Sequence, residues 1–344
     1  MNYADAVASI WRQSLSGTSA LTPRELDRYA TLAASSHNTQ PWRFEIVPDA
    51  IVIRPDFRRR CAAVDPDDHH LFASLGCAAE NLVLAAAAAG LESDVRFEPA
   101  TTSLRIALSK GEVHRSALFE AIVSRQCTRT EYDGRPLSAD DLRLLEAAGR
   151  SRGVDVLLLT GPNQKDAVAQ YVAQGNTVQF ADAAWAAELQ AWIRFSAREA
   201  IRTGDGLYGP VMGSPSVPRW IGKAFMRFAF SSAAQNRKDT RNIRSSSAIA
   251  VIYSDENDAA HWIEAGRCYQ RLALQAGALG LKTAFINQPV EVPGLRPQFA
   301  HHLGIGDRRP DLVVRIGRAP AAPRSLRRPL DEVIDNVATP RMAN

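Results

Sequence analysis

The chain has 344 residues, of which 46% are hydrophobic and 23% charged, and its formal net charge is +4. These values exclude a disordered chain and predict a soluble globular protein with one large domain or two of ordinary size. No uninterrupted run of 18 apolar residues exists, which excludes a simple membrane-spanning segment, and we expect no membrane partner.

Patterns for export, metal binding and nucleic-acid binding are weak. The first twelve residues lack a basic head and an apolar core, so we predict a short amphipathic helix and a cytoplasmic location. The four cysteines show no Cys-x-x-Cys spacing, and the adjacent pairs His69-His70 and His301-His302 diverge on a helix, so we predict no metal site. The arginine clusters near residues 58–60 and 324–328 lack interleaved aromatic residues, so we predict no nucleic-acid partner.

Capping and hydrophobic patterns define the elements of the first part of the chain. Thr22-Pro23-Arg24-Glu25 is a capping box with proline at the first helical position, and Asp65-Pro66-Asp67 precedes a second helical pattern that Gly90 ends. The turn at 48–50 predicts a β-hairpin. The predicted elements are a helix at about 23–34, strands at 42–47 and 51–54, a helix at about 68–89, and strands near 95–97 and 104–108.

The loop between the first helix and the first strand is dense in hydrogen-bonding side chains. Asn38 and Gln40 each offer an amide donor and a carbonyl acceptor, and Ser35 and Ser36 add hydroxyls. The residue before Pro41 is pushed toward an extended conformation. This set suits the edge of a heterocycle that alternates donors and acceptors, such as a flavin or a pyrimidine. A plain polar loop with capping serines is the alternative that composition alone supports.

A comparable order of elements begins again after residue 115. The cap pattern at 137–142 repeats that at 21–26 with an offset of 116, and residues 154–159 supply the following strand. Residues 71–91 laid over 261–281, at an offset of 190, give seven identities, among them Gly76 with Gly266 and Gly90 with Gly280. Both segments predict buried, Ala-rich helices. We therefore expect two half-folds, 1–115 and 116–338, packed about a pseudo-twofold axis through these helices, with a loose tail at 339–344.

The two offsets differ by 74 residues, so we predict an insertion of about that length within 161–245 of the second half. That region is rich in aromatic residues and contains a Gly/Pro-rich stretch at 204–218. We predict two or three helices that form a lid over a site, and the alternative is peripheral padding of the core. Further strands are predicted at 245–253, 282–287 and 312–316.

A second polar segment, Arg125-Gln126-Cys127-Thr128-Arg129, carries two arginines four residues apart with small polar residues between them. Arg327 and Arg328 form another basic pair near the C-terminus, and Asn287-Gln288-Pro289 repeats the amide chemistry of the first polar loop. A few arginines suffice to bind one phosphate. Taken alone, the first segment could equally be a surface helix end.

The segment from Ser35 to Phe44 resembles the Ser-Ser-x-Asn-x-Gln-Pro-Trp-x-Phe signature of the nitroreductase-like flavoproteins, with six spaced residue types matching. Along nearly its whole length, the chain is most similar to the Acg-type tandem members. The resemblance implies an α+β nitroreductase-like fold in tandem, in which two half-sized copies imitate the usual homodimer and an inserted lid covers FMN. Because that dimer is internal, a monomer is expected.

The resemblance also implies roles for individual residues. Arg125 and Cys127 would face the FMN phosphate, and Arg129 would face the flavin N1/O2 side, although the family more often has Ser or Thr in place of Cys127. The remaining cofactor-binding residues that it implies are Ser35, Ser36, Asn38, Gln40, Asn287, Gln288, Arg327 and Arg328. The first-half position equivalent to 125–129, residues 9–13, lacks paired arginines, so we predict one FMN per chain.

Three functions fit this resemblance. The first is an NAD(P)H-dependent oxidoreductase acting on a small-molecule electron acceptor such as a nitroaromatic or a quinone, in which the flavin N5 carries the chemistry and no catalytic side chain is required. The second is an FMN storage or sequestration protein without turnover. The third is a specialised flavin dehydrogenase of a metabolite or peptide, for which no distinguishing residue exists.

Overall fold

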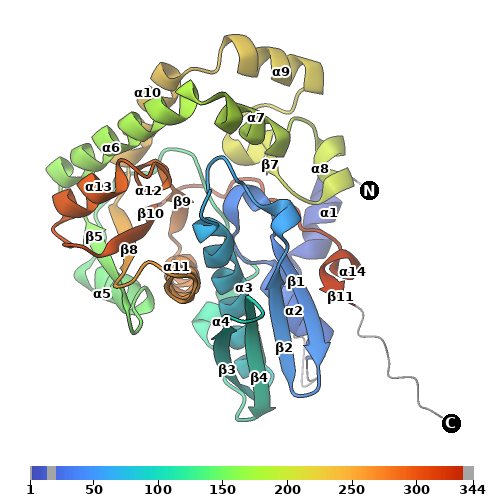
Figure 1. The fold of residues 1–344 in the computed structure, drawn as a ribbon. Helices are drawn as coiled ribbons and strands as arrows, with labels where there is room; N and C mark the ends of the chain where they lie inside the picture. The colour runs from blue at the N-terminus through green and yellow to red at the C-terminus, as the bar shows by residue number, and fades with distance from the viewer. Residues whose placement is uncertain (1, 14–20, 336–344) are drawn as a thin grey trace.

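Two helices of 20 residues, α3 (His69–Ala88) and α11 (Ala259–Ala278), pack against each other at the centre of the molecule (Figure 1). The computed structural model describes residues 2–13 and 21–335, and the predicted tail at 339–344 lies outside them. The mixture of helices with antiparallel sheets confirms the predicted α+β class.

The contact between the two central helices is reciprocal. A Cβ atom placed on Gly76 would lie 1.9 Å from the carbonyl oxygen of Ile263, and one placed on Gly266 would lie 1.9 Å from that of Ala73. Since Gly266 follows Gly76 and Ile263 follows Ala73 by the same 190 positions, each contact is the image of the other. Only glycine lets the backbones approach so closely. The predicted pseudo-twofold axis therefore passes between these two glycines.

Each half contributes a sheet with the same strand order. The first sheet runs β1-β2-β4-β3 and the second β5-β8-β10-β9, and all neighbours within each set are antiparallel. The strands of the first half are β1 (Trp42–Val47), β2 (Ala50–Pro55), β3 (Leu91–Glu98) and β4 (Ser103–Lys110). Those of the second half are β5 (Val154–Leu159), β8 (Ala248–Ser254), β9 (Lys282–Phe285) and β10 (Arg309–Gly317). This shared order confirms the tandem arrangement.

Shorter helices flank the two sheets. Thr22 caps α2 with the predicted capping box, and Ser138 caps α5 in the same way. The predicted division after residue 115 falls between β4 and α4. Besides α3 and α11, the helices outside the insertion are α1 (Tyr3–Ile10), α2 (Pro23–Thr31), α4 (Ala117–Ala121), α5 (Ala139–Ala148), α12 (Gln288–Glu291), α13 (Arg296–Leu303) and α14 (Leu330–Val333), and 3-10 turns lie at Ser36–Asn38 and Phe57–Arg59.

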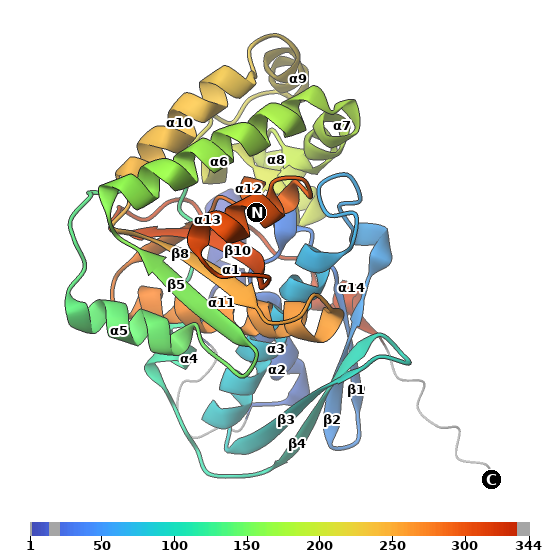
Figure 2. The same cartoon turned by 60° about the vertical axis from the view of Figure 1, so that its left-hand side comes forward.

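The insertion forms a helical layer above the rest of the molecule (Figures 1 and 2). It contains five helices, so the prediction of two or three was too low. Asp182 explains part of the difference, because it ends α6 and caps α7 through its side chain. The inserted elements are α6 (Pro162–Ala181), α7 (Ala183–Trp192), β6 (Ile193–Arg194), α8 (Ala197–Thr203), β7 (Leu207–Tyr208), a 3-10 turn at Gly209–Met212, α9 (Arg219–Phe228) and α10 (Ser232–Arg244).

The last strand of the described residues pairs with the first strand. Strand β11 (Ile334–Asp335) pairs in parallel with β1 and forms the edge of the first sheet. The main hydrophobic core surrounds α3 and α11 and takes side chains from both halves. Among the described residues, α3 is the one helix that is long and apolar enough to cross a membrane, and most of it is buried inside the protein.

Candidate functional site

Three neighbouring cavities lie between the lid, the polar loop at 35–40 and the second sheet. Their volumes are about 220, 450 and 60 Å³, and we call them the central, lid and narrow cavities. Arg129 and Phe285 line all three. The cavities therefore meet around one cationic and one aromatic side chain.

The backbone around Arg129 is fixed while its side chain is free. The neighbouring Thr128 donates its backbone N–H to the carbonyl of Thr283 at 2.9 Å, and Asn242 donates its amide to the Arg129 carbonyl at 3.3 Å. Within residues 2–13 and 21–335, the Arg129 guanidinium forms neither a hydrogen bond nor an ion pair. An unpaired cation at the meeting point of three cavities is suited to an anionic or electron-rich ligand.

The narrow cavity is bordered by Arg125, Cys127 and Arg327, and also by Ser35 and Asn38. These residues come from both halves, as the resemblance implies. The Nη2 of Arg125 donates to the carbonyl of Leu32 at 2.9 Å, while its buried Nε has no partner. This orphaned donor is available to a ligand.

Arg327 is placed differently from Arg125. Its three guanidinium nitrogens donate to the carbonyls of residues 31–33 and 326 and to the side-chain oxygen of Asn38. Burial, together with the nearby Arg125 charge, lowers the pKa of Arg327 to about 9. Arg327 thus brings positive charge to the narrow cavity, although its donors are already in use.

Arg328 lies outside the linings of the three cavities. Its guanidinium bonds to the carbonyls of Gln40 and Glu332 and pairs with the Glu332 carboxylate. Two other arginines of the C-terminal segment are also engaged: Arg318 pairs with Asp141, and Arg324 bonds to the carbonyls of residues 123 and 124. Of the predicted phosphate-binding arginines, Arg125 alone combines a cavity lining with an unpaired donor.

The side chains of the polar loop at 35–40 have two different roles. Ser35 and Ser36 line the central cavity, and Asn38 reaches the narrow one. The Asn38 amide, however, donates to the carbonyls of Gly206 and Leu326, each at 3.2 Å. Gln40 is fully buried and lines none of the three cavities. The amides of this loop therefore hold the lid and the C-terminal segment.

The backbone of this loop differs from the prediction. His37, Asn38 and Gln40 have positive φ values of 48°, 54° and 53°. The expected extended conformation of Gln40 before Pro41 is thus wrong. Its buried side chain, bonded to the lid and to Arg328 N–H, accounts for the left-handed conformation, which costs energy in a residue other than glycine.

Asn287 and Gln288 both lie on the central cavity, and Gln288 also borders the lid cavity. Asn287 accepts a 2.8 Å hydrogen bond from Val313 N–H, which orients its amide toward His70 Nε2 at 3.2 Å. Gln288 donates to Asn176 at 3.2 Å, and its buried Oε1 has no partner. Gln288 Oε1 is therefore a free acceptor beside the cavities.

His70, His37 and Glu291 also line the central cavity, although sequence analysis did not select them. Burial acts to lower the pKa of His70, but the hydrogen bond to Asp65 and the charges of Asp65 and Glu291 together outweigh burial and raise the pKa above its ordinary value. Burial and the Arg129 charge lower the pKa of His37 to about 4, so this side chain is neutral near pH 7. His37 lies within the polar loop itself, whereas tertiary folding brings His70 and Glu291 to the cavity from distant segments.

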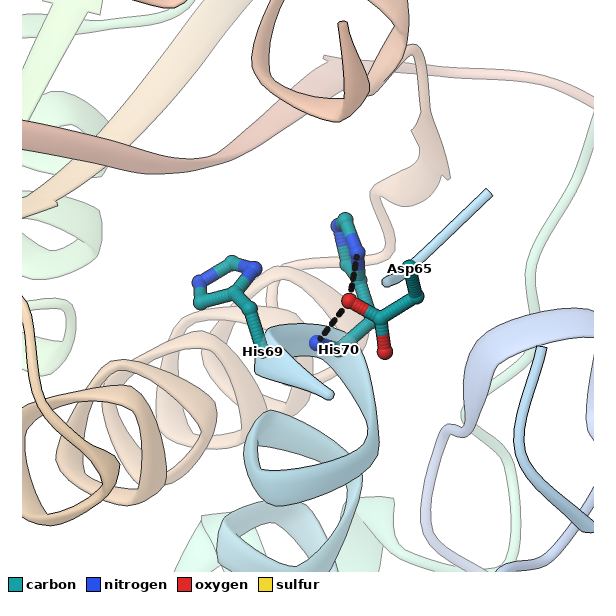
Figure 3. A group of neighbouring side chains, drawn as sticks. All are labelled: Asp65, His69 and His70. Atoms are coloured by element: carbon teal, nitrogen blue, oxygen red, sulfur yellow. Dashed lines mark hydrogen bonds and ion pairs between the residues drawn. The ribbon is translucent and has the colours of Figure 1, made fainter. Parts of the chain in front are cut away.

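Asp65, His69 and His70 bring potential ligand atoms within 4.8 Å of one another (Figure 3). The expected divergence of the two imidazoles is wrong, because their ring centroids lie 4.6 Å apart. Asp65 accepts the backbone N–H groups of His70 and Leu71 at 2.9 and 3.0 Å, which caps α3. His69 Nε2 instead contacts Asp311 at 3.0 Å. The cluster thus starts a helix and buries two His–Asp contacts.

The lid cavity is the most apolar of the three. Its polar floor contains Lys238, Asp239 and Arg315 beside Arg129. Its apolar walls come mainly from the inserted helices and include Phe180, Trp185, Leu189, Phe195, Phe225, Met226 and Phe230. A ligand with a polar end and an apolar body fits this division.

No protein-family model matches the chain. The chain is 28% identical over 339 residues to the Mycobacterium tuberculosis protein named "Putative NAD(P)H nitroreductase Rv3131", with 91% of each chain covered. It is 25% identical over 322 residues to "Putative NAD(P)H nitroreductase acg" of the same organism, covering 88% of this chain and 92% of that one.

Solved structures are more distant in sequence. The FMN-dependent nitroreductase NfnB from Mycobacterium smegmatis, in complex with NADPH, is 14% identical, with a TM-score of 0.42. The match covers 64% of this chain and 98% of that one. The two curated relatives confirm that the chain is similar to the Acg-type nitroreductase-like proteins.

Proposed function

We propose that this relative of the Acg-type nitroreductase-like proteins binds one FMN in the cavities around Arg129 and is an NAD(P)H-dependent flavin oxidoreductase. The observation that carries the proposal is the unpaired Arg129 guanidinium at the meeting point of three cavities. The names of the curated relatives support the reaction class. We further propose nitroaromatics, quinones or related compounds as electron acceptors.

The free donors and acceptors fit FMN. Arg125 Nε is a buried donor without a partner at the narrow cavity, where Arg327 adds positive charge and Cys127 borders the space, so we assign the phosphate to this end. Gln288 Oε1 is a buried acceptor without a partner, which suits an N–H group of the ring system. Bound FMN would supply the hydride-transfer chemistry.

The protein side chains bind and tune rather than react. Arg129 would lie at the N1/O2 side of the flavin, where a cation raises the reduction potential. Ser35, Ser36 and Asn287 would border the ring system, because they line the central cavity. Asn38, Gln40 and Arg328 would support this arrangement indirectly by holding the lid and the C-terminal segment.

Each chain contains all the residues assigned to the site. Ser35 and Ser36 come from the first half, whereas Arg125, Arg129, Asn287 and Gln288 come from the second. We therefore propose that a monomer forms a complete site and that 1–115 and 116–338 act as its two halves.

Sequestration of FMN is the second candidate, and the fastening of the lid favours it. Asp205 of the lid forms ion pairs with Arg59 and with Arg194, the latter at 2.6 Å, and all three side chains are largely buried. Gln40 and Asn38 bond to the neighbouring carbonyls of Gly204 and Gly206. A lid fastened at so many points would hinder a hydride donor from reaching the flavin.

The visible spectrum of the FMN-loaded protein under anaerobic conditions separates these candidates. Bleaching of the flavin band within seconds of adding NADPH or NADH is the result expected of an oxidoreductase. A stable oxidised spectrum with both donors would favour sequestration, and failure to bind FMN at all would contradict both.

A further inference from the structure

Helix α9 of the lid presents large apolar side chains to the outside. Trp220 is 72% exposed, Phe228 80% and Phe225 56%, and Ile221 is also exposed. Among the described residues, these four make up half of the exposed large hydrophobic side chains. A cluster of this kind on a single ten-residue helix marks an interaction surface.

The residues of α9 are sorted around its axis. At about 100° per residue, Trp220, Ile221, Phe225 and Phe228 fall within an arc of about 140°. Arg219, Lys223 and Arg227 occupy an adjacent arc of about 80°. Gly222 and Met226 fall on the remaining side and line the lid cavity. The helix therefore has an aromatic outer face, a basic flank and an inner face toward the cavity.

Close packing fixes α9 in this orientation. A Cβ atom on Gly222 would lie 2.0 Å from the ring of Phe195, so the helix rests directly on that side chain. Figures 1 and 2 both place α9 at the outer end of the lid, far from the first sheet. Its aromatic face is consequently free to meet a large partner surface.

The surroundings of α9 are basic. Residues 183–244 contain ten basic and four acidic residues, a net charge of +6, which exceeds the +4 of the whole chain. All four acidic residues are engaged or buried: Asp205 and Asp239 are buried, Glu199 pairs with Arg219, and Glu188 accepts backbone N–H groups of residues 63 and 64. The lid thus presents exposed aromatic residues within a positive field.

We propose that α9 docks the protein on an anionic phospholipid surface and opens the lid cavity to apolar electron acceptors dissolved in the bilayer. Aromatic residues beside lysines and arginines are the composition of helices that lie in a membrane interface. Such contact does not require a membrane-spanning segment. The expectation of no membrane partner was based only on the absence of such a segment from the sequence. The acceptor part of this proposal rests on the proposed oxidoreductase function, whereas the docking part does not.

Charge favours a bilayer over a second copy of the chain. Two copies that met through α9 would bring two strongly positive lids together, and like charges oppose such a contact. Anionic lipids instead attract basic residues near the membrane surface, and each such residue increases the binding affinity about fivefold. Ile221 and Phe225 contribute to both the exposed face and the wall of the lid cavity, so α9 forms the partition between bilayer and cavity.

Vesicle flotation tests the docking without reference to activity. The FMN-loaded protein should float with vesicles of phosphatidylglycerol and phosphatidylcholine, and much less with pure phosphatidylcholine. The double variant Trp220→Ser/Phe228→Ser should bind at least tenfold more weakly, because each aromatic side chain loses its apolar burial. Val113→Ser/Leu144→Ser removes two other exposed apolar side chains and should not change binding.

The basic flank is tested separately. Lys223→Glu/Arg227→Glu should weaken binding to anionic vesicles by about thirtyfold or more, since it removes two attractive charges and adds two repulsive ones. Arg96→Glu/Lys110→Glu changes the net charge equally on exposed positions of β3 and β4, and its binding should stay close to that of the natural chain. If both double variants lost vesicle binding equally, net charge alone would explain the loss, and the assignment of membrane binding to α9 would be overturned.

The acceptor part of the proposal is tested with a quinone that carries a long alkyl chain and is placed in the same vesicles. NADPH gives up a hydride, the quinone takes the two electrons and that hydrogen, and one proton from water completes the hydroquinone. Trp220→Ser/Phe228→Ser should lower the rate with the vesicle-borne quinone at least tenfold and leave that with a water-soluble quinone unchanged.

Two further results would overturn the proposal. One is failure of the natural chain to bind anionic vesicles while it still loads FMN. The other is sedimentation as a dimer that Trp220→Ser/Phe228→Ser converts to a monomer, which would identify the partner as a second copy. Failure of flavin reduction by NADPH in every variant, with vesicle binding intact, would contradict the proposed function and the acceptor part that rests on it, and would leave the docking part supported.

Discussion

The side-chain amide of Gln40 donates a 2.9 Å hydrogen bond to the backbone carbonyl of Gly204, a residue 164 positions later in the chain. The Gln40 Oε1 also accepts the backbone N–H of Arg328 at 2.8 Å. One buried side chain thus fastens the polar loop to the lid and to the C-terminal segment. Opening of the lid requires this bond to break.

Asp205→Asn should loosen the lid, because it leaves Arg59 and Arg194 without their counter-ion in a largely buried position. Breaking a buried ion pair in this way costs about 3–5 kcal/mol. Hydrogen exchange should accelerate in residues 193–208, and bound FMN should dissociate faster. Glu131→Gln, which breaks an exposed pair with Arg241, serves as the control and should leave both rates unchanged.

Arg129→Gln should weaken FMN binding, since it removes the unpaired cation shared by the three cavities. Loss of a charge-assisted hydrogen bond costs about 1.5–3 kcal/mol, or roughly 10- to 150-fold in Kd. Fluorescence titration measures the Kd, and the reduction potential of the bound flavin should fall as well. Arg143→Gln, on the exposed face of α5, is the matched control. An unchanged Kd would remove Arg129 from the site.

Titration of the apoprotein should reach saturation at one FMN per chain. The unpaired arginine donors that suit the cofactor, at Arg125 and Arg129, both come from the second half, and the corresponding segment at 9–13 lacks paired arginines. Absorbance of the released flavin against protein concentration gives the ratio. A value near two would mean that the first half also supplies a phosphate site.

Gly76→Ala and Gly266→Ala should destabilise the protein to a similar extent. Each new methyl group would lie 1.9 Å from a carbonyl oxygen of the other central helix, so α3 and α11 would have to move apart. Such overpacking costs about 3 kcal/mol or more at a site this tight. Urea denaturation measures the change. Gly294→Ala is the control, since no atom lies within 4 Å of its added Cβ.

Asp27→Asn should alter the pH dependence of stability. Burial raises the pKa of Asp27 to about 8, and neither carboxyl oxygen has a hydrogen-bond partner among the described residues. The folded protein therefore holds this proton more tightly than the unfolded chain does. The contribution of Asp27 to the free energy of unfolding is fully present below about pH 4 and is lost as the pH rises to 8. The variant should lose that decline in urea denaturation between pH 5 and 8. Asp94→Asn, at an exposed pair with Arg96, should retain it.

Local patterns predicted much of the fold. The strands at Trp42–Val47 and Val154–Leu159 match their predicted bounds, because each contains apolar side chains and is flanked by residues that interrupt strands. The alignment at an offset of 190 anticipated the reciprocal contact of Gly76 and Gly266. Repeated glycines were informative here since each half of a pseudo-symmetric interface needs the same small residue.

Long-range structure was harder to predict. Strand β11 has only two residues, which is too short for any hydrophobic pattern, and it pairs with residues of β1 that lie 290 positions earlier in the chain. The orientation of Gln40 depends on a lid residue far along the sequence. His70 and Glu291 enter the central cavity through tertiary packing. None of these relationships leaves a mark within a local window of sequence.

The position of β11 bears on when the protein can mature during synthesis. The ribosome makes Ile334 and Asp335 about 290 residues after their partners Phe44 and Glu45, yet these residues complete the edge of the first sheet. Arg327 and the N–H of Arg328, which fix the polar loop, arrive equally late. The first half therefore lacks these contacts until the ribosome has made residues 327–335. A cofactor site that includes the polar loop is consequently complete only after residues 327–335 have been made.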